Sequence, residues 1–123
     1  MKICITSTGN TLDSAVDPRF GRCWNFIFFD TESGNFDAEE NPNYQLQGGA
    51  GIQSGQLVAS RGAKAVLTGN IGPNAHQVLR AAGISVFTGV SGTVKDAIEG
   101  YKNNSYSAAD SPSVGSKFGM PNK

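Results

Sequence analysis

Short apolar runs in the first part of the chain predict three β-strands. Residues 2–7 and 23–30 are rich in β-branched and aromatic side chains, as buried strands are. Residues 31–34 have the composition of a hairpin turn, so residues 35–40 are predicted as a third, more polar strand. The polar stretch between the first two strands, residues 8–22, is long for a connection, and long ordered loops are often functional.

From residue 52 onward, helical spacing alternates with short apolar strands. Residues 52–61 are a weak helix candidate, and residues 65–68 and 84–88 are predicted strands. A second helix begins at Pro73, where the missing N–H costs nothing, and a third begins after Thr93. The apolar residues recur at i, i+3, i+4 and i+7: Ala75, Val78, Leu79 and Ala82 in one helix, and Val94, Ala97, Ile98 and Tyr101 in the other.

The order β-β-β-α-β-α-β-α predicts an α/β fold in which helices pack on a mixed five-stranded sheet. Residues 1–102 account for all of these elements and form one predicted domain. Residues 103–123 are rich in Asn, Ser, Pro and Gly, so we expect a flexible C-terminal tail without a fold of its own.

Charge and hydropathy exclude several classes of partner. Ten basic residues balance ten acidic ones over 123 residues, which predicts no electrostatic hold on nucleic acid or on an anionic membrane. The apolar runs are too short for a bilayer-spanning helix, and the N-terminal stretch is too short for a signal peptide. A cytoplasmic protein is therefore expected.

Three loops should gather at the carboxyl ends of the strands, where open α/β sheets bind ligands. They are residues 8–22, 68–72 and 88–92, and the last two lead into helix N-termini, whose free N–H groups favour an anion. The binding candidates in these two loops are Asn70, Gly72, Ser91, Gly92 and Thr93.

Two arginines in the first loop offer donors to the same anion. Arg19 and Arg22 bracket Phe20 and Gly21, and a guanidinium presents five donors and no acceptor. The alternative for each arginine is a solvated charge or an ion pair with Asp13 or Asp17. Both interpretations stay open at this point.

Metal ligands are scarce in the sequence. Cys23 could supply a thiolate and His76, the single histidine, a neutral imidazole. The alternatives are a packed strand residue and a partly exposed polar residue. No pattern of four ligands, no G-x-S-x-G, no P-loop and no H-E-x-x-H occurs, and the first strand carries no carboxylate for a two-metal nuclease. No enzyme activity is predicted.

One motif resembles a known family. Asp17-Pro18-Arg19-Phe20-Gly21-Arg22 before an aromatic strand is similar to the opening motif of the dinitrogenase iron–molybdenum cofactor-binding family, which includes NifX, NafY and the C-terminal domain of NifB. Later motifs of the chain follow the same order as in the family, and the resemblance covers about residues 1–102. These pieces are Asn41-Pro42, Gly49-Ala50-Gly51, the strand and turn from Gly62 to Gly72, Pro73-Asn74-Ala75, Ala82-Gly83-Ile84 and Gly92-Thr93-Val94.

The resemblance implies a ribonuclease H-like fold and a non-catalytic carrier or storage role in cofactor assembly, as in nitrogen fixation and in stand-alone relatives from anaerobes. The implied cargo is iron–molybdenum cofactor, its precursor or a related molybdenum, iron or copper cluster with sulfur. It is bound reversibly and is not required for folding. By position, Arg19, Phe20, Gly21 and Arg22 would form the binding loop, and the implied partners are proteins that donate or receive the cluster.

Two features separate this chain from parts of that family. It has no C-x-x-x-C-x-x-C, so it cannot build a cluster itself, and its motif continues as Cys23-Trp24. A metal-free adaptor or regulator with the same fold is the alternative, supported by the aromatic residues Tyr44, Tyr101 and Tyr106. The carrier hypothesis would fail if the structure placed the two guanidinium groups on the far side of the sheet from loops 69–72 and 89–92.

Overall fold

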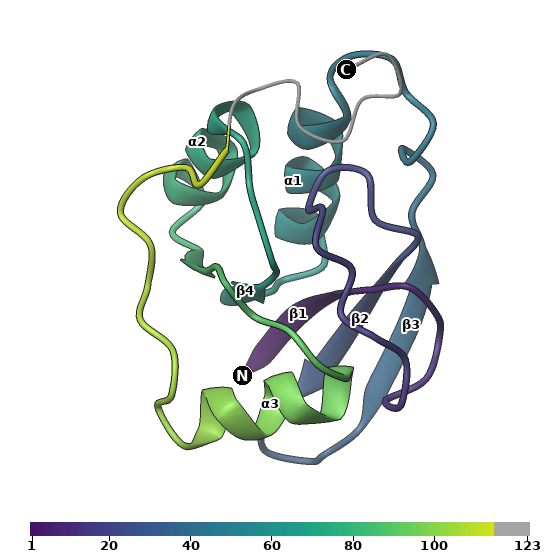
Figure 1. Ribbon diagram of the computed structural model, residues 1–123, viewed down its shortest axis with the longest axis vertical. Coiled ribbons are helices and arrows are strands. Elements are labelled where there is room, and N and C mark those ends of the chain that lie inside the picture. Colours follow the sequence, from purple (N-terminus) through teal and green to yellow (C-terminus); the bar gives the residue numbers. More distant parts are fainter. Residues whose placement is uncertain (115–123) are drawn as a thin grey trace.

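The computed structural model describes residues 1–114 of the chain. A five-stranded sheet in the order β3-β2-β1-β4-β5 carries helices on both faces (Figure 1). The strands are β1 (Lys2–Ser7), β2 (Asn25–Asp30), β3 (Phe36–Glu40), β4 (Ala65–Leu67) and β5 (Ser85–Phe87), and the helices are α1 (Ala50–Ser60), α2 (Pro73–Ala81) and α3 (Val94–Lys102). The predicted element order and the mixed sheet are confirmed. The boundaries differ slightly: the strand predicted from residue 23 begins at Asn25, and the helix predicted from residue 52 begins at Ala50.

β1 lies at the centre of the sheet. It pairs antiparallel with β2 and parallel with β4, so that Cys4 lies opposite both Phe28 and Val66. Ile3, Cys4 and Ile5 have no exposed surface, and burial on both faces explains why β1 reads as a continuous apolar run. β3 forms one edge and is mostly exposed, with the acidic sequence Phe-Asp-Ala-Glu-Glu.

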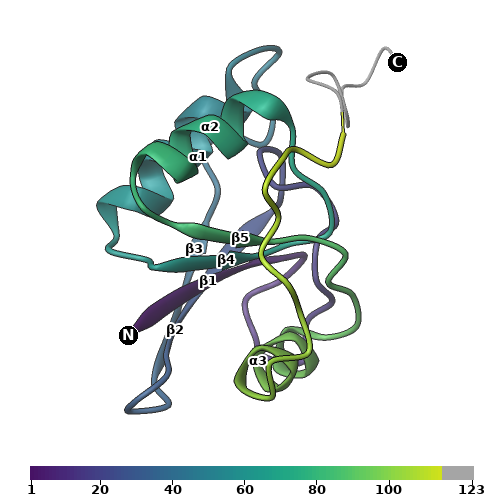
Figure 2. The same cartoon turned by 90° about the vertical axis from the view of Figure 1, so that its left-hand side faces the viewer.

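Alternate side chains of the strands build two separate cores. α1 and α2 cover one face of the sheet and α3 covers the other (Figure 2). Cys4, Phe26 and Phe28 face α1 and α2, whereas Ile3, Ile5 and Ile27 face α3. In α2, the predicted apolar stripe is partly wrong: Ala82 is exposed just beyond the helix end, and His76 occupies a buried position instead.

The C-terminal strap, which we define as residues 105–114, runs along the outer edge of β5 (Figure 2). It forms no helix or strand of its own, but Ala108 bridges to Phe87, and the Ala109 N–H donates to the Val86 carbonyl at 2.7 Å. Farther on, Ser113 contacts Ile71 through its backbone and its hydroxyl group. Flexibility of the predicted tail stays a prediction, and its residues 115–123 lie outside the described part of the chain.

No helix within residues 1–114 has both the length and the apolar character to cross a bilayer. The longest of them, α1, has 11 residues and is amphipathic.

Glycines allow the loop after β1, α1 and α2 to approach one another closely. A Cβ atom on Gly21 would lie 2.9 Å from the Cα and N atoms of Gly51, and one on Gly51 would lie 3.2 Å from the Cβ atom of Ala75. Real Cβ atoms essentially never come as close to backbone as the first of these distances. The starts of α1 and α2 are therefore drawn together beside the first loop.

This contact predicts the effect of one added methyl group. We expect Gly21→Ala to lower the free energy of unfolding by about 1–3 kcal/mol, because the new Cβ atom meets backbone that cannot rotate away. Gly48→Ala is the matched control, since a Cβ there has no neighbour within 4 Å. Chemical denaturation measures both, and equal stability of the two variants would contradict the close approach.

Candidate functional site

The three predicted loops meet at the carboxyl edge of the sheet, and the first two join directly beside α2. The Asn70 N–H donates to the Pro18 carbonyl at 2.7 Å, and the Phe20 N–H donates to the Asn70 carbonyl at 3.1 Å. Arg19 and Asn70 thus form a short parallel bridge between the first loop and the turn before α2. The structure brings together the predicted residues Arg19, Phe20, Asn70 and, two residues later, Gly72.

The N-termini of α1 and α2 have no side-chain cap. Gly49 and Gly72 occupy the two N-cap positions, and neither helix has an acidic residue in its first turn. The first backbone N–H groups of such helices lack intrahelical acceptors, and the helix dipole adds positive potential there. Because Gly51 touches Ala75, both helix starts belong to one region. We call it the α1/α2 edge, comprising residues 19–21, 49–51 and 70–75.

The start of α3 differs in charge and in position. Thr93 and Asp96 form a capping box in which each side chain accepts a backbone N–H at 3.1 Å. The predicted residues Ser91, Gly92 and Thr93 lie at the same end of the sheet, where Gly92 accepts the Val16 N–H at 2.9 Å. They belong to the α3 face, however, and the Asp96 carboxylate already occupies that helix start.

The start of α1 was missed by sequence reasoning. The sequence feature that marks this uncapped helix start is the pair Gly48-Gly49, with no Ser, Thr, Asp or Asn at the N-cap position. Because the apolar pattern is weak, the predicted helix begins at residue 52, two residues after its true start. The uncapped N-terminus at Gly49 was therefore not predicted.

Arg22 is engaged by the protein itself. Its guanidinium group, in a residue that is 9% exposed, donates to the carbonyl of Leu46 and, at 3.2 Å, to that of Gln47. These carbonyls lie in the segment before α1. Arg22 therefore fixes the approach to the helix, and its donors do not point with those of Arg19 into a common pocket.

Arg19 remains accessible, with 34% of its side chain exposed. The ion pair with Asp17, one of the predicted alternatives to anion binding, is present: the Arg19 Nε atom lies 3.4 Å from the Asp17 Oδ1 atom. Within residues 1–114, the terminal Nη groups of Arg19 have no acceptor. The Asp17 carboxylate thus binds the Nε atom of Arg19 and leaves the Nη donors at the α1/α2 edge without a partner among the described residues.

Asp17 organises the first loop from inside the protein. Its side chain is 2% exposed and accepts the backbone N–H of Arg19 at 3.1 Å and that of Trp24 at 3.2 Å. Its own carbonyl accepts the Thr6 hydroxyl at 2.7 Å, which ties the loop to β1. The motif contained Asp17, but nothing in the sequence indicated that it would be buried.

The side chains of Phe20 and Cys23 are buried in the core, so Phe20 contributes only its backbone to the α1/α2 edge. Phe20 is 2% exposed and its ring lies 6.0 Å from that of Phe26. Cys23 is fully buried, and burial raises the pKa of its thiol well above the usual value. A protonated thiol in this position is a poor source of the thiolate that a metal requires.

His76 points toward the C-terminal strap. It is 6% exposed, and its Nε2 atom lies 3.2 Å from the Ala109 carbonyl. Within residues 1–114, no three His, Cys, Asp or Glu side chains gather closely enough to hold a metal ion. The ligand roles of Cys23 and His76 stay predictions, and these contacts count against them.

The aromatic residues behind the adaptor alternative are largely used internally. Tyr101 and Tyr106 pack against the core under α3, and Tyr101 meets Phe87 edge to face at 5.5 Å. Tyr44 stacks on Trp24, whose exposed fraction is 47%, with ring centroids 4.5 Å apart. All three tyrosines are half-buried, and Trp24 is the exposed member of the last pair.

Comparison with known proteins decides the family. The family model described as dinitrogenase iron-molybdenum cofactor matches residues 1–104. The chain belongs to this family. The match ends two residues after α3, so the C-terminal strap lies beyond it.

Relatives of this dinitrogenase cofactor family member share sequence and fold. An uncharacterized protein of Methanocaldococcus jannaschii is 32% identical over 102 residues, covering 80% of this chain and 83% of its own. The apo form of the orange protein from Desulfovibrio gigas superposes with a TM-score of 0.89 at 36% identity, over 92% of this chain and 96% of that one. A NifB-like protein of the DUF35 family from Thermotoga gives 0.77 at 36% identity, over 87% and 91%.

The buried carboxylate leads to a stability prediction. Asp17→Ala leaves the N–H groups of Arg19 and Trp24 without their acceptor, so we expect a loss of about 1–3 kcal/mol in the free energy of unfolding. Asp13→Ala, in the same loop but exposed, should be nearly neutral. Urea denaturation compares the two, and a neutral Asp17→Ala would show that the loop does not depend on this side chain.

The cysteines lead to a reactivity prediction. Burial raises the pKa of both the Cys4 and Cys23 thiols, and neither is accessible. At pH 8 the native protein should therefore react with a thiol reagent far more slowly than the urea-unfolded protein, in which both groups react. Rapid labelling of native Cys23, located by peptide mass spectrometry, would instead favour its role as a ligand.

Proposed function

We propose that this protein is a non-catalytic carrier or storage protein that binds an anionic metal–sulfur cluster reversibly at the α1/α2 edge. The observation that carries the proposal is the meeting of two uncapped helix starts beside the free donors of Arg19. Each helix start offers backbone N–H donors and positive potential to an anion. The glycines at positions 49 and 51 add no side chain at the start of α1, and Gly21 lets the first loop approach its backbone closely.

The proposed cargo is iron–molybdenum cofactor, its precursor or a related cluster of molybdenum, iron or copper with sulfur. Support comes from the family description, which names the cofactor, and from relatives described as NifB-like and as the apo form of an orange protein. Such a cluster is a polyanion with a polarizable sulfur surface, which suits N–H and guanidinium donors. Binding through charge and hydrogen bonds, and not through several protein ligands to the metal, favours reversible transfer of the cluster.

The remaining features of the proposal follow from that role. Partners would be assembly proteins that donate or receive the cluster, in the cytoplasm, with nitrogen fixation as one setting. Folding would not need the cargo, since the core is filled by apolar side chains. We also propose that the fold is ribonuclease H-like, supported by an antiparallel β1-β2-β3 unit that is extended by parallel strands at β1.

The function is tested with tetrathiomolybdate as a probe under anaerobic conditions. Binding should shift the visible absorption of the probe and give a fixed molybdenum content after desalting. Arg19→Gln should weaken binding about tenfold to a hundredfold, because a charge-assisted donor contributes about 1.5–3 kcal/mol.

Lys64→Gln is the matched control for net charge. Lys64 is exposed just before β4, at the opposite end of that strand from Asn70, so its loss should leave binding unchanged. Absence of binding by the wild-type protein, for both tetrathiomolybdate and isolated iron–molybdenum cofactor, would refute the carrier function. Equal losses in both variants would refute the assignment of the site.

A further inference from the structure

The C-terminal strap is fastened to the body of the protein at three places. Ala109 pairs with β5 through its N–H and accepts from His76 through its carbonyl. The Arg80 guanidinium donates to the Asp110 carbonyl at 3.0 Å. Ser113 is the last anchor, and there the strap reaches the turn between β4 and α2.

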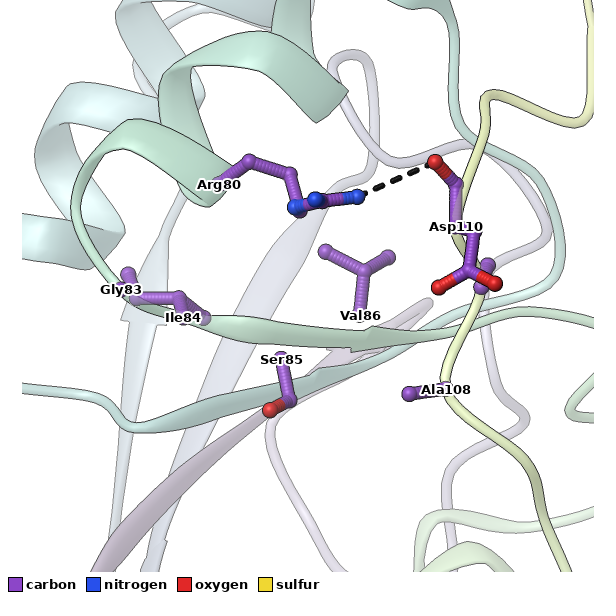
Figure 3. A pocket seen from close by; sticks show the side chains of 8 residues that line it. Arg80, Gly83, Ile84, Ser85, Val86, Ala108 and Asp110 are labelled. Atoms are coloured by element: carbon purple, nitrogen blue, oxygen red, sulfur yellow. Dashed lines mark hydrogen bonds between the residues drawn. The ribbon is translucent and has the colours of Figure 1, made fainter.

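Apart from Tyr106, which packs against the core under α3, the strap is held by hydrogen bonds with little apolar burial. The side chains of the strap are mainly small or polar, and most of its residues are exposed. An open pocket of about 320 Å³ is lined by residues of the strap, the end of α2 and β5. Figure 3 shows Arg80 spanning this space to Asp110 above Val86. Segments with exposed hydrogen bonds and few packed apolar contacts open at a lower free energy than a core strand does.

The last anchor, Ser113, binds the middle of loop 69–72, which we call the site loop. The Ser113 hydroxyl accepts the Ile71 N–H at 2.8 Å, and the N–H groups of Ser113 and Val114 donate to the Ile71 carbonyl at 2.9 and 3.2 Å. Ile71 lies between Asn70, which bridges to Arg19, and Gly72, the N-cap of α2. Both polar groups of this peptide backbone are therefore held by the strap.

We propose that the strap opens and closes as one unit, and that its closed form holds loop 69–72 in the conformation that receives the cargo. This inference rests on the proposed function for the identity of the cargo, but strap opening itself is a property of the free protein. The strap lies beyond the residues that the family model matches.

Linkage fixes the sign of the effect. If closure favours binding, then bound cargo must disfavour the open strap by the same free energy by which strap opening weakens binding. A strap that masked the site would show the opposite sign, with tighter binding when an anchor is removed.

The test uses the full chain and removes one anchor. Ser113→Ala deletes the hydroxyl that binds Ile71, and Ser111→Ala is the matched control, because Ser111 is exposed and its hydroxyl has no hydrogen-bond partner within residues 1–114. Native-state hydrogen exchange of the free protein is followed at Ala109 and Val114 in the strap and at Asn70 in the site loop. Tetrathiomolybdate dissociation is measured by stopped-flow absorption.

In the wild-type protein, the Ala109 and Val114 amides should exchange with one common protection factor, well below that of the β1 amides. Ser113→Ala should speed exchange at both amides and at Asn70 by about fivefold, and should speed probe dissociation by a similar factor. Ser111→Ala should change neither. Added tetrathiomolybdate should slow exchange in the wild-type strap.

Other results overturn the inference in distinct ways. Unequal protection of Ala109 and Val114 would show that the strap does not open as a unit. Faster exchange in the strap without any change at Asn70 would show that the strap does not control loop 69–72. Slower probe dissociation from Ser113→Ala would show that the strap masks the site. If the wild-type protein binds no probe, the proposed function fails, while the exchange data still decide whether strap and loop are coupled.

Discussion

The close approach of Gly21, Gly51 and Ala75 is the contact on which the arrangement of the site depends. It allows the loop after β1 to lie directly on the first turn of α1, and that turn to lie on α2. Side chains at these positions would push the loop and the two helices apart. The same small residues therefore bring the first loop and both helix starts together at one edge of the sheet.

Charge is distributed sparingly around this edge. Arg22 is bound to backbone carbonyls, and the charge of Arg19 is partly balanced by the buried Asp17 carboxylate. Attraction for an anion then comes mainly from backbone dipoles and from the outer donors of one guanidinium group. A weak attraction of this kind fits the reversible binding that we propose for a chain of zero net charge.

The sequence was most informative where local physics dominates. Alternating strand and helix periods predicted the order of all eight elements, and the Thr93–Asp96 pair predicted the capping box that forms. It was less informative about long-range contacts. Whether Arg22 would reach the carbonyls of Leu46 and Gln47, more than twenty residues away, depends on the folded loop and leaves no local pattern.

The site was predicted in part for the same reason. Arg19, Asn70 and Gly72 lie together because strand order dictates it, whereas Ser91, Gly92 and Thr93 lie on the other face of the sheet. Sheet topology specifies which ends meet, but the choice of face follows from helix packing. Burial of His76 against a backbone carbonyl also depends on a segment whose composition suggested no contact at all.

The two borders of the sheet are protected by different means. At β3, Asp37, Glu39 and Glu40 place like charges along the exposed strand, which discourages pairing with a second molecule. At β5, protection comes from the chain itself, since Ala108 and Ala109 occupy its unpaired side. Proteolytic loss of that covering would bare a short apolar strand, and association between copies would then begin at β5 and not at β3.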